Sequence, residues 1–152
     1  MQIWVDGDAC PKKVKQILFK AVERTKIQLI LVANHVSHIP ISPYIKMIIV
    51  PSGFDEADKR IQSDANRGDL VITADIPLAS EVVAKGCFAL NPRGTFYNKE
   101  NIQQQLAVRN LMAQLREQQL ISGGVDTFNA QDSQAFADQL DRFLAKVSNG
   151  MR

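Results

Sequence analysis

The sequence predicts an α/β fold with a mainly parallel five-stranded sheet and helices on both of its faces. Short apolar segments alternate along the chain with segments of helical period, which is the order that parallel strands and crossover helices produce. Some of the short segments, such as LILVA and MIIV, are apolar at every position, as strands are when helices cover both sides of a sheet. A chain of 152 residues, 45% of them apolar, is typical of one compact domain, which we place over residues 1–152.

The five expected strands are short and rich in branched apolar residues, and turn or helix signals separate them. They cover residues 2–5, 28–33, 46–50, 70–74 and 87–90. Between the first two, apolar residues recur at the spacing of one helix face, which predicts a helix that begins near Pro11. The residues of that face are Val14, Ile17, Leu18, Ala21 and Val22.

Two more crossover helices are expected, one over residues 52–65 and one over 76–85. Ser52 is a candidate N-cap of the first, with Asp55 and Glu56 in its first turn. Gly86 ends the second. Together with the strands they make a three-layer arrangement.

The chain changes character after residue 91. A loop is followed by a helix from about residue 100 to 120, an SGG break, and a last helix that begins near Asn129. We expect these two extra C-terminal helices to cover the same core, and the pattern equally allows them to pair with another chain.

Charge and cysteine content indicate the kind of protein. A formal net charge of +2 is compatible with a nucleic-acid partner only through local basic patches. Cys10 and Cys87 form no CxxC pair, and the chain has neither a signal-peptide pattern at its start nor 18 consecutive apolar residues. We therefore expect a cytoplasmic protein that does not associate with membranes, and no protein partner can be identified.

Aspartates follow three of the expected strands. Asp6 and Asp8 follow the first, Asp55 and Asp58 the third, and Asp75 the fourth. Ligands bind at the carboxyl ends of strands in open parallel sheets, so these side chains are expected to converge. Converging carboxylates repel one another unless they are protonated or bind a hard cation, and oxygen ligands suit Mg²⁺ or Mn²⁺.

We therefore predict a Mg²⁺ or Mn²⁺ site with all five aspartates as ligands. Such ions activate water for attack on a phosphodiester, which makes Asp6, Asp8, Asp55 and Asp75 the candidate catalytic residues. Ser52 and Arg93, which follow the third and fifth strands, are expected to contact the phosphate of the substrate.

Each of these residues also has a structural interpretation. Asp8 and Asp75 could cap the helices that follow them, and the helix dipole alone favours Asp55 in a first turn. Asp58 could be solvated, and Arg93 could form a structural ion pair.

Residues away from the aspartates have similar alternatives. Phe96 and Tyr97 could stack on a base or anchor their own loop. Asp69 is expected in a turn at the entrance of the fourth strand, away from the ligand-binding edge. Lys12 and Lys15 are expected on a solvated helix face, and Cys10 as a small buried thiol.

Four motifs, VDGDACP, GFDEAD, GDLVITADIPLA and NPRGTFY, together resemble the YaiI/YqxD family of uncharacterised bacterial proteins. The resemblance implies a PIN-like domain, distantly similar to Mg²⁺- or Mn²⁺-dependent ribonucleases and flap nucleases. It also implies an acidic set of Asp6 with or without Asp8, Asp55 or Asp58, and Asp75. The chain departs from PIN-like domains in its Asp-Gly-Asp pair, and from the YaiI/YqxD family in Val125, where proline is expected.

Three functions are compatible with these observations. A metal-dependent nuclease acting on RNA or DNA accounts for the converging aspartates. A haloacid-dehalogenase-type phosphatase would use Asp6 as nucleophile and Asp8 as acid and base, but Asn34 stands where such enzymes have serine or threonine. A non-catalytic module that binds nucleic acid or protein would keep the fold without the chemistry.

Overall fold

The computed structural model of the chain describes residues 1–53, 55–120 and 127–150. Its strands are β1 (Gln2–Asp6), β2 (Gln28–Ala33), β3 (Ile45–Ile49), β4 (Leu70–Ile72), β5 (Phe88–Leu90) and β6 (Phe96–Tyr97). They form one sheet in the order β3-β2-β1-β4-β5-β6, in which only β6 runs antiparallel to its neighbour among the described strands. The carboxyl ends of β1 and β4 therefore lie side by side near the middle of the sheet.

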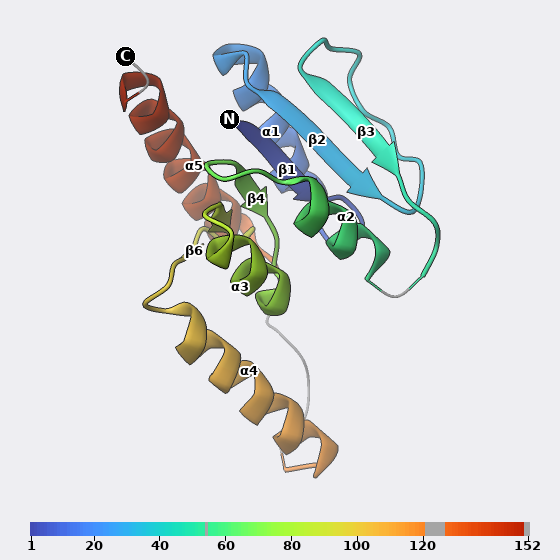
Figure 1. Cartoon of the computed structure of the whole chain (residues 1–152), viewed down its shortest axis with the longest axis vertical. Coiled ribbons are helices and arrows are strands. Elements are labelled where there is room, and N and C mark those ends of the chain that lie inside the picture. Colours follow the sequence, from blue (N-terminus) through green and yellow to red (C-terminus); the bar gives the residue numbers. More distant parts are fainter. Residues whose placement is uncertain (54, 121–126, 151–152) are drawn as a thin grey trace.

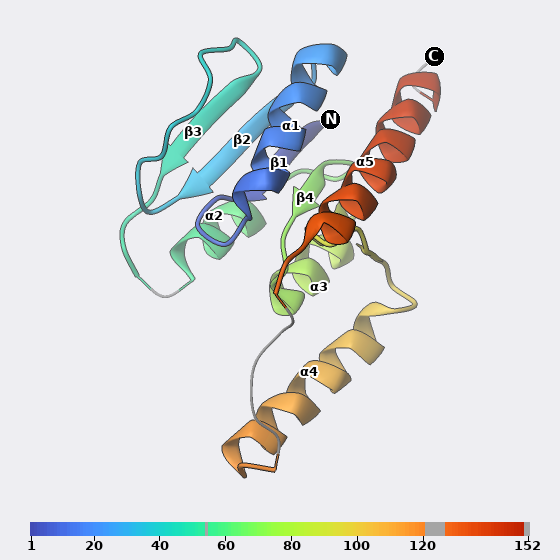
Figure 2. The same ribbon diagram turned by 180° about the vertical axis from the view of Figure 1, so that it is seen from behind.

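Five helices accompany the sheet in the described residues: α1 (Lys12–Thr25), α2 (Glu56–Asp64), α3 (Ile76–Ala84), α4 (Ile102–Glu117) and α5 (Ala130–Gly150). α2 and α3 cover one face, and α1 and α5 cover the other (Figures 1 and 2). The predicted three-layer α/β fold with a mainly parallel sheet is confirmed. None of the described helices combines the length and the apolar character needed to span a membrane.

The sheet has six strands where the sequence predicted five, because the chain reverses after β5. Gly94 adopts a φ of +95°, and the backbone N–H of Arg93 donates to Oδ1 of Asn91 at 2.7 Å, which closes the turn. Phe96 and Tyr97 then pair antiparallel with β5. A strand of two residues is too short for an alternating pattern to reveal.

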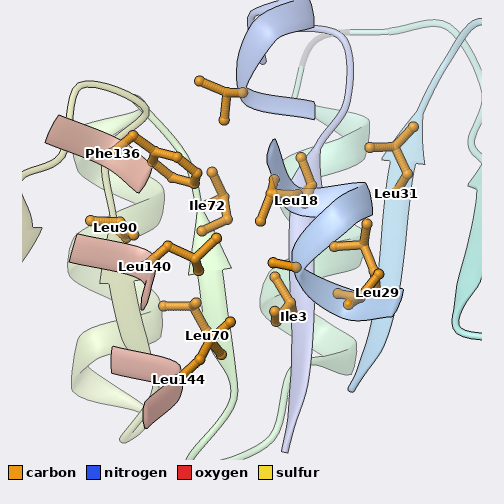
Figure 3. Close-up of a cluster of buried hydrophobic side chains, with 14 of the residues drawn as sticks. Ile3, Leu18, Leu29, Leu31, Leu70, Ile72, Leu90, Phe136, Leu140 and Leu144 are labelled. Carbon is orange, nitrogen blue, oxygen red and sulfur yellow. The ribbon is translucent and has the colours of Figure 1, made fainter. Parts of the chain in front are cut away.

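Alternating side chains of the strands serve two separate cores. In β1, Ile3 and Val5 face α1 and α5, whereas Trp4 faces α2 and α3. Figure 3 shows the first core, in which Phe136 and Leu140 of α5 pack over the sheet beside Leu18 of α1. This two-sided burial is the reason that several strands read as continuous apolar segments.

The two C-terminal helices differ in how they meet the core. The apolar stripe of α5 is buried, as predicted, through Phe136, Leu140 and Leu144. α4 packs against α3, but among its residues only Ile102 is buried, and the helix projects away from the sheet (Figure 1). The expectation of core cover is thus correct for α5 and wrong for most of α4. The SGG segment between them lies outside the described residues.

Candidate functional site

The aspartates come together because three elements end or begin at the same edge of the sheet. Asp6 is the last residue of β1, and Asp75 precedes α3 just after β4, the strand that pairs with β1. α2 packs against β1 and β2, which brings its first turn, with Asp58, to this edge. The predicted convergence at the carboxyl ends of the strands is present for these three residues.

One oxygen atom from each of Asp55, Asp58 and Asp75 lies within 4.8 Å of the others. The Asp58 side chain is also in hydrogen-bonding contact with the carboxyl groups of Asp75 and Asp6. Asp58 is therefore the centre of the group, and it links the β1 end to the α3 start. We call Asp6, Asp55, Asp58 and Asp75 the acidic cluster.

The negative charges of the acidic cluster repel one another. Burial, together with the charges of Asp75, Asp6 and Asp55 and a hydrogen bond to Asp75, raises the pKa of Asp58 to about 7. Burial is also the main cause that raises the pKa of Asp6, and the charges of Asp8 and Asp75 add to it. With every carboxyl ionised the cluster is destabilised, so it favours either a shared proton or a bound cation.

The cluster opens into a cavity of about 430 Å³. Asp55, Asp58 and Asp75 line it together with two cationic side chains, Lys59 of α2 and Arg109 of α4. Sequence reasoning did not single out these two cations. Arg109 in particular lies on a helix distant in sequence, and no local pattern connects it with the strand ends.

Asp75 has two roles, because a carboxylate has two oxygen atoms. Its Oδ1 accepts a hydrogen bond from the backbone N–H of Leu78 at 2.9 Å, so the predicted capping of α3 is confirmed. The Asp75 backbone N–H in turn donates to Oγ1 of Thr73 at 3.0 Å. These bonds fix the residue at the cluster and leave further acceptor capacity on the carboxylate.

Asp8 does not cap α1, so that interpretation is wrong. The N-cap position belongs to Pro11, without a side-chain capping bond. Oδ2 of Asp8 instead accepts a hydrogen bond from the backbone N–H of Asn34 at 2.7 Å, and Oδ1 lies 3.7 Å from Nδ1 of His35. Asp8 is near enough to Asp6 to raise its pKa, yet it is engaged by the loop that follows β2.

α2 begins later than the sequence predicted. Asp55 occupies the N-cap position with a φ of +62°, a left-handed conformation that aspartate tolerates better than most residues, and the first helical residue is Glu56. Ser52 is therefore not the cap, because it lies too far before the helix. It is exposed on the loop after β3, and its contact with substrate stays a prediction.

Arg93 forms a structural ion pair, which is one of the two roles that the sequence left open. Its Nη1 lies 2.9 Å from Oδ2 of Asp132 at the start of α5, and its guanidinium lies 5.9 Å from the ring centre of Phe128. A contact between Arg93 and phosphate stays a prediction. Phe96 and Tyr97 anchor their segment: the ring of Phe96 lies 5.6 Å from that of Phe143, and the Tyr97 hydroxyl accepts from Nδ2 of Asn91 at 2.8 Å.

Comparison with known proteins places the chain in a family. The profile described as "Uncharacterized BCR, YaiI/YqxD family" matches residues 4–146. The UPF0178 protein of Hahella chejuensis is 55% identical over 148 residues, which cover 97% of this chain and 99% of the relative. The UPF0178 protein of Maridesulfovibrio salexigens is 54% identical over 149 residues, or 98% of this chain and 99% of the relative.

No solved structure gives a significant match to the chain. The resemblance predicted from the four motifs is confirmed over nearly the whole length. The chain belongs to the YaiI/YqxD family of uncharacterised bacterial proteins.

Proposed function

We propose that the protein is a divalent-metal-dependent phosphodiesterase that cleaves RNA or DNA. The observation that carries this proposal is the meeting of Asp55, Asp58 and Asp75 oxygens within 4.8 Å, with Asp6 in contact with Asp58. A similar role for strand-end carboxylates is implied by the resemblance to PIN-like domains.

The chemistry of the cluster fits Mg²⁺ or Mn²⁺. Its donors are all carboxylate oxygens, which these hard cations prefer over nitrogen and sulfur. Burial and the neighbouring carboxylates raise the pKa values of Asp58 and Asp6, so a bound cation would relieve the cost of ionising them. Asp55, Asp58 and Asp75 would hold the cation, with Asp6 and Asp8 beside them. Such an ion supplies a water of lowered pKa and neutralises charge on phosphate oxygens.

The side chains around the cation would have three further roles: accepting a proton, orienting the cluster and attracting the phosphate. Asp6, half-buried and with a raised pKa, is suited to accept a proton from attacking water at a carboxylate oxygen. Asp75 is held in place by the Leu78 and Thr73 bonds, so it orients the cluster. Lys59 and Arg109 line the same cavity and would attract the phosphate, a role in which Ser52 and Arg93 remain candidates.

The phosphatase alternative has less support. It requires Asp8 to act as acid and base beside Asp6, and the Asp8 carboxylate is engaged by Asn34 and His35. A non-catalytic binding module is the outcome to expect if the cluster binds metal and no ester is cleaved.

The test is a calorimetric Mn²⁺ titration of the wild type, Asp58→Asn and the control Asp64→Asn, which makes the same charge change at the other end of α2. Cleavage of labelled single-stranded RNA and DNA, and of p-nitrophenyl phosphate, is followed on the same preparations. We expect Asp58→Asn to lose more than about tenfold in Mn²⁺ affinity, since even indirect partners of a metal are worth that much. Asp64→Asn should match the wild type. A wild type that binds no Mn²⁺ would refute the proposal.

A further inference from the structure

A second cavity, unlike the first, has no carboxylate among its lining residues. It is a groove of about 800 Å³ between α1 and the loop that follows β2. Lys12, Lys15 and Phe19 contribute from α1, and His38, Ile39 and Ile41 contribute from the loop. We call it the α1 groove. One wall is cationic and the other mainly aliphatic, so it fits a ligand that is both anionic and apolar.

The α1 wall presents a line of contacts along the helix. Lys12, Lys15 and Phe19 are three and four residues apart and thus share a helix face. Seven residues of helix span about 10 Å. Lys15 is half-buried, whereas Lys12 is exposed like Lys13 and Lys20 of the same helix.

The groove lies next to the acidic cluster. Cys10, which also lines it, is close enough to Lys15 and Asp6 for both charges to act on its thiol, whose pKa is raised to about 12 chiefly by burial. Cys10 is partly buried rather than fully buried as predicted, and its raised pKa makes the thiol unreactive; its closeness to both Lys15 and Asp6 relates the α1 groove to the end of β1.

The loop wall exposes apolar side chains that no packing explains. Ile41 is fully exposed, and Val36 on the same loop is 82% exposed. The loop is nevertheless held at its start by the hydrogen bond between Asn34 and Asp8. Exposed apolar side chains beside lysines mark an interaction surface, and the ring of Phe19 on the opposite wall is of the kind on which bases stack.

We propose that the α1 groove binds single-stranded nucleic acid and leads it to the acidic cluster. Lys12 and Lys15 contact phosphates nearest the cluster, and Phe19, Ile39 and Ile41 contact bases. The roughly 10 Å of helix accommodates only a few nucleotides of a strand. A single strand fits better than a duplex, because its base faces are free to stack on side chains. This inference rests on the proposed function, since it supplies the substrate class for that site.

The experiment is a fluorescence anisotropy titration of a labelled twelve-nucleotide single strand, as RNA and as DNA, and of the matching duplex. It is run in EDTA and again in Ca²⁺, with the wild type, Lys12→Gln/Lys15→Gln and the control Lys13→Gln/Lys20→Gln. The control removes the same charge from the same helix at positions outside the groove. Ile41→Ser tests the apolar wall with little risk to folding, because the side chain is exposed.

We expect the groove variant to bind the single strand about tenfold or more weakly than the control does. Its log–log salt slope should fall by about 1.4, or 0.7 for each lost phosphate contact. Ile41→Ser should weaken binding without changing that slope. Equal affinities of the groove and control variants, tighter binding of the duplex, or no binding by the wild type in either buffer would each overturn the proposal.

The two proposals fail separately. If Mn²⁺ binds and bis(p-nitrophenyl) phosphate is cleaved, but the affinity for the single strand does not depend on Lys12 and Lys15, the groove assignment is wrong and the metal site is retained. If strand affinity depends on the groove while no Mn²⁺ binds, the groove stands as a binding site and the cleavage proposal is wrong.

Discussion

The backbone N–H of Asn34 donates a 2.7 Å hydrogen bond to the carboxylate of Asp8, so the loops that follow β1 and β2 are joined at the edge of the sheet. The loop after β1 begins at the acidic cluster, and the loop after β2 forms a wall of the α1 groove. One aspartate thus connects the two places where we propose that chemistry and strand binding occur.

The Asp8 bond needs an acceptor oxygen more than it needs a charge. We expect Asp8→Ala to lower the free energy of unfolding by about 1 kcal/mol, the usual net worth of such a hydrogen bond. Asp8→Asn retains a side-chain oxygen and should lose less than half of that. Urea unfolding of both variants measures the difference. Equal losses would show that the negative charge of Asp8, and not its acceptor geometry, holds the loop.

Asp58 should make the metal-free protein less stable as pH rises. Its pKa is about 7 in the folded chain and near 3.8 when unfolded, so between these values the folded state binds more protons, and stability falls with increasing pH. Asp58→Asn removes this effect. We expect the variant to be about 1 kcal/mol more stable than the wild type at pH 8, a figure reduced for solvent screening of a half-exposed group, and equal to it near pH 4.

The measurement is chemical unfolding in EDTA at pH 4, 6 and 8. A difference between variant and wild type that is independent of pH would contradict the assignment of the raised pKa to Asp58. Mn²⁺ should cancel the effect in the wild type, because binding of the cation displaces the proton.

Asp69 is a buried carboxylate with a structural role. Its Oδ2 accepts from Nε1 of Trp4 at 3.0 Å and from the backbone N–H of Asn66 at 2.9 Å, and its Oδ1 accepts from the backbone N–H of Gln2 at 3.0 Å. Asp69→Ala leaves three donors without this acceptor, so we expect a loss of about 3 kcal/mol or more.

Trp4→Phe, which removes one of those donors and keeps a large ring, should cost about 1–2 kcal/mol. Thermal unfolding of both variants and of the double variant gives the coupling between Trp4 and Asp69. A loss below about 1 kcal/mol for Asp69→Ala would mean that water replaces the carboxylate. Mn²⁺ affinity should not change, because Asp69 lies at the opposite end of β4 from the cluster.

Gly94 and Gly68 both have a positive φ, but only Gly94 also lacks space for a Cβ atom. Their φ values are +95° and +91°, but a Cβ on Gly94 would lie 2.7 Å from the backbone carbon of Ala135, whereas a Cβ on Gly68 meets nothing within 4 Å. Gly68→Ala should therefore cost only the backbone term of about 1–2 kcal/mol. Gly94→Ala should cost more than about 3 kcal/mol, because α5 must move. Equal losses in urea unfolding would show that α5 accommodates the methyl group.

The sequence was informative wherever a property is local. Short apolar segments predicted the first five strands, because a strand covered on both faces is apolar throughout, and apolar residues at a period of 3.6 predicted the presence of five helices. The strand-end positions of Asp6 and Asp75 followed from the same reasoning, as did the cap on α3. Local pattern failed at β6, which is too short to show a period, and at the start of α2, where Asp55 replaces Ser52 at the cap.

Only the tertiary structure decided which residues meet. An apolar stripe shows that a face is covered and does not say by what, so it left open that α4 projects from the core while α5 covers it. Several contacts of the candidate site join segments that are far apart in the chain. They are the hydrogen bond between Asn34 and Asp8, the ion pair of Arg93 with Asp132, and the approach of Asp58 to both Asp6 and Asp75. Such contacts are set by strand order and helix packing, and the sequence encodes these only through the energy of the whole fold.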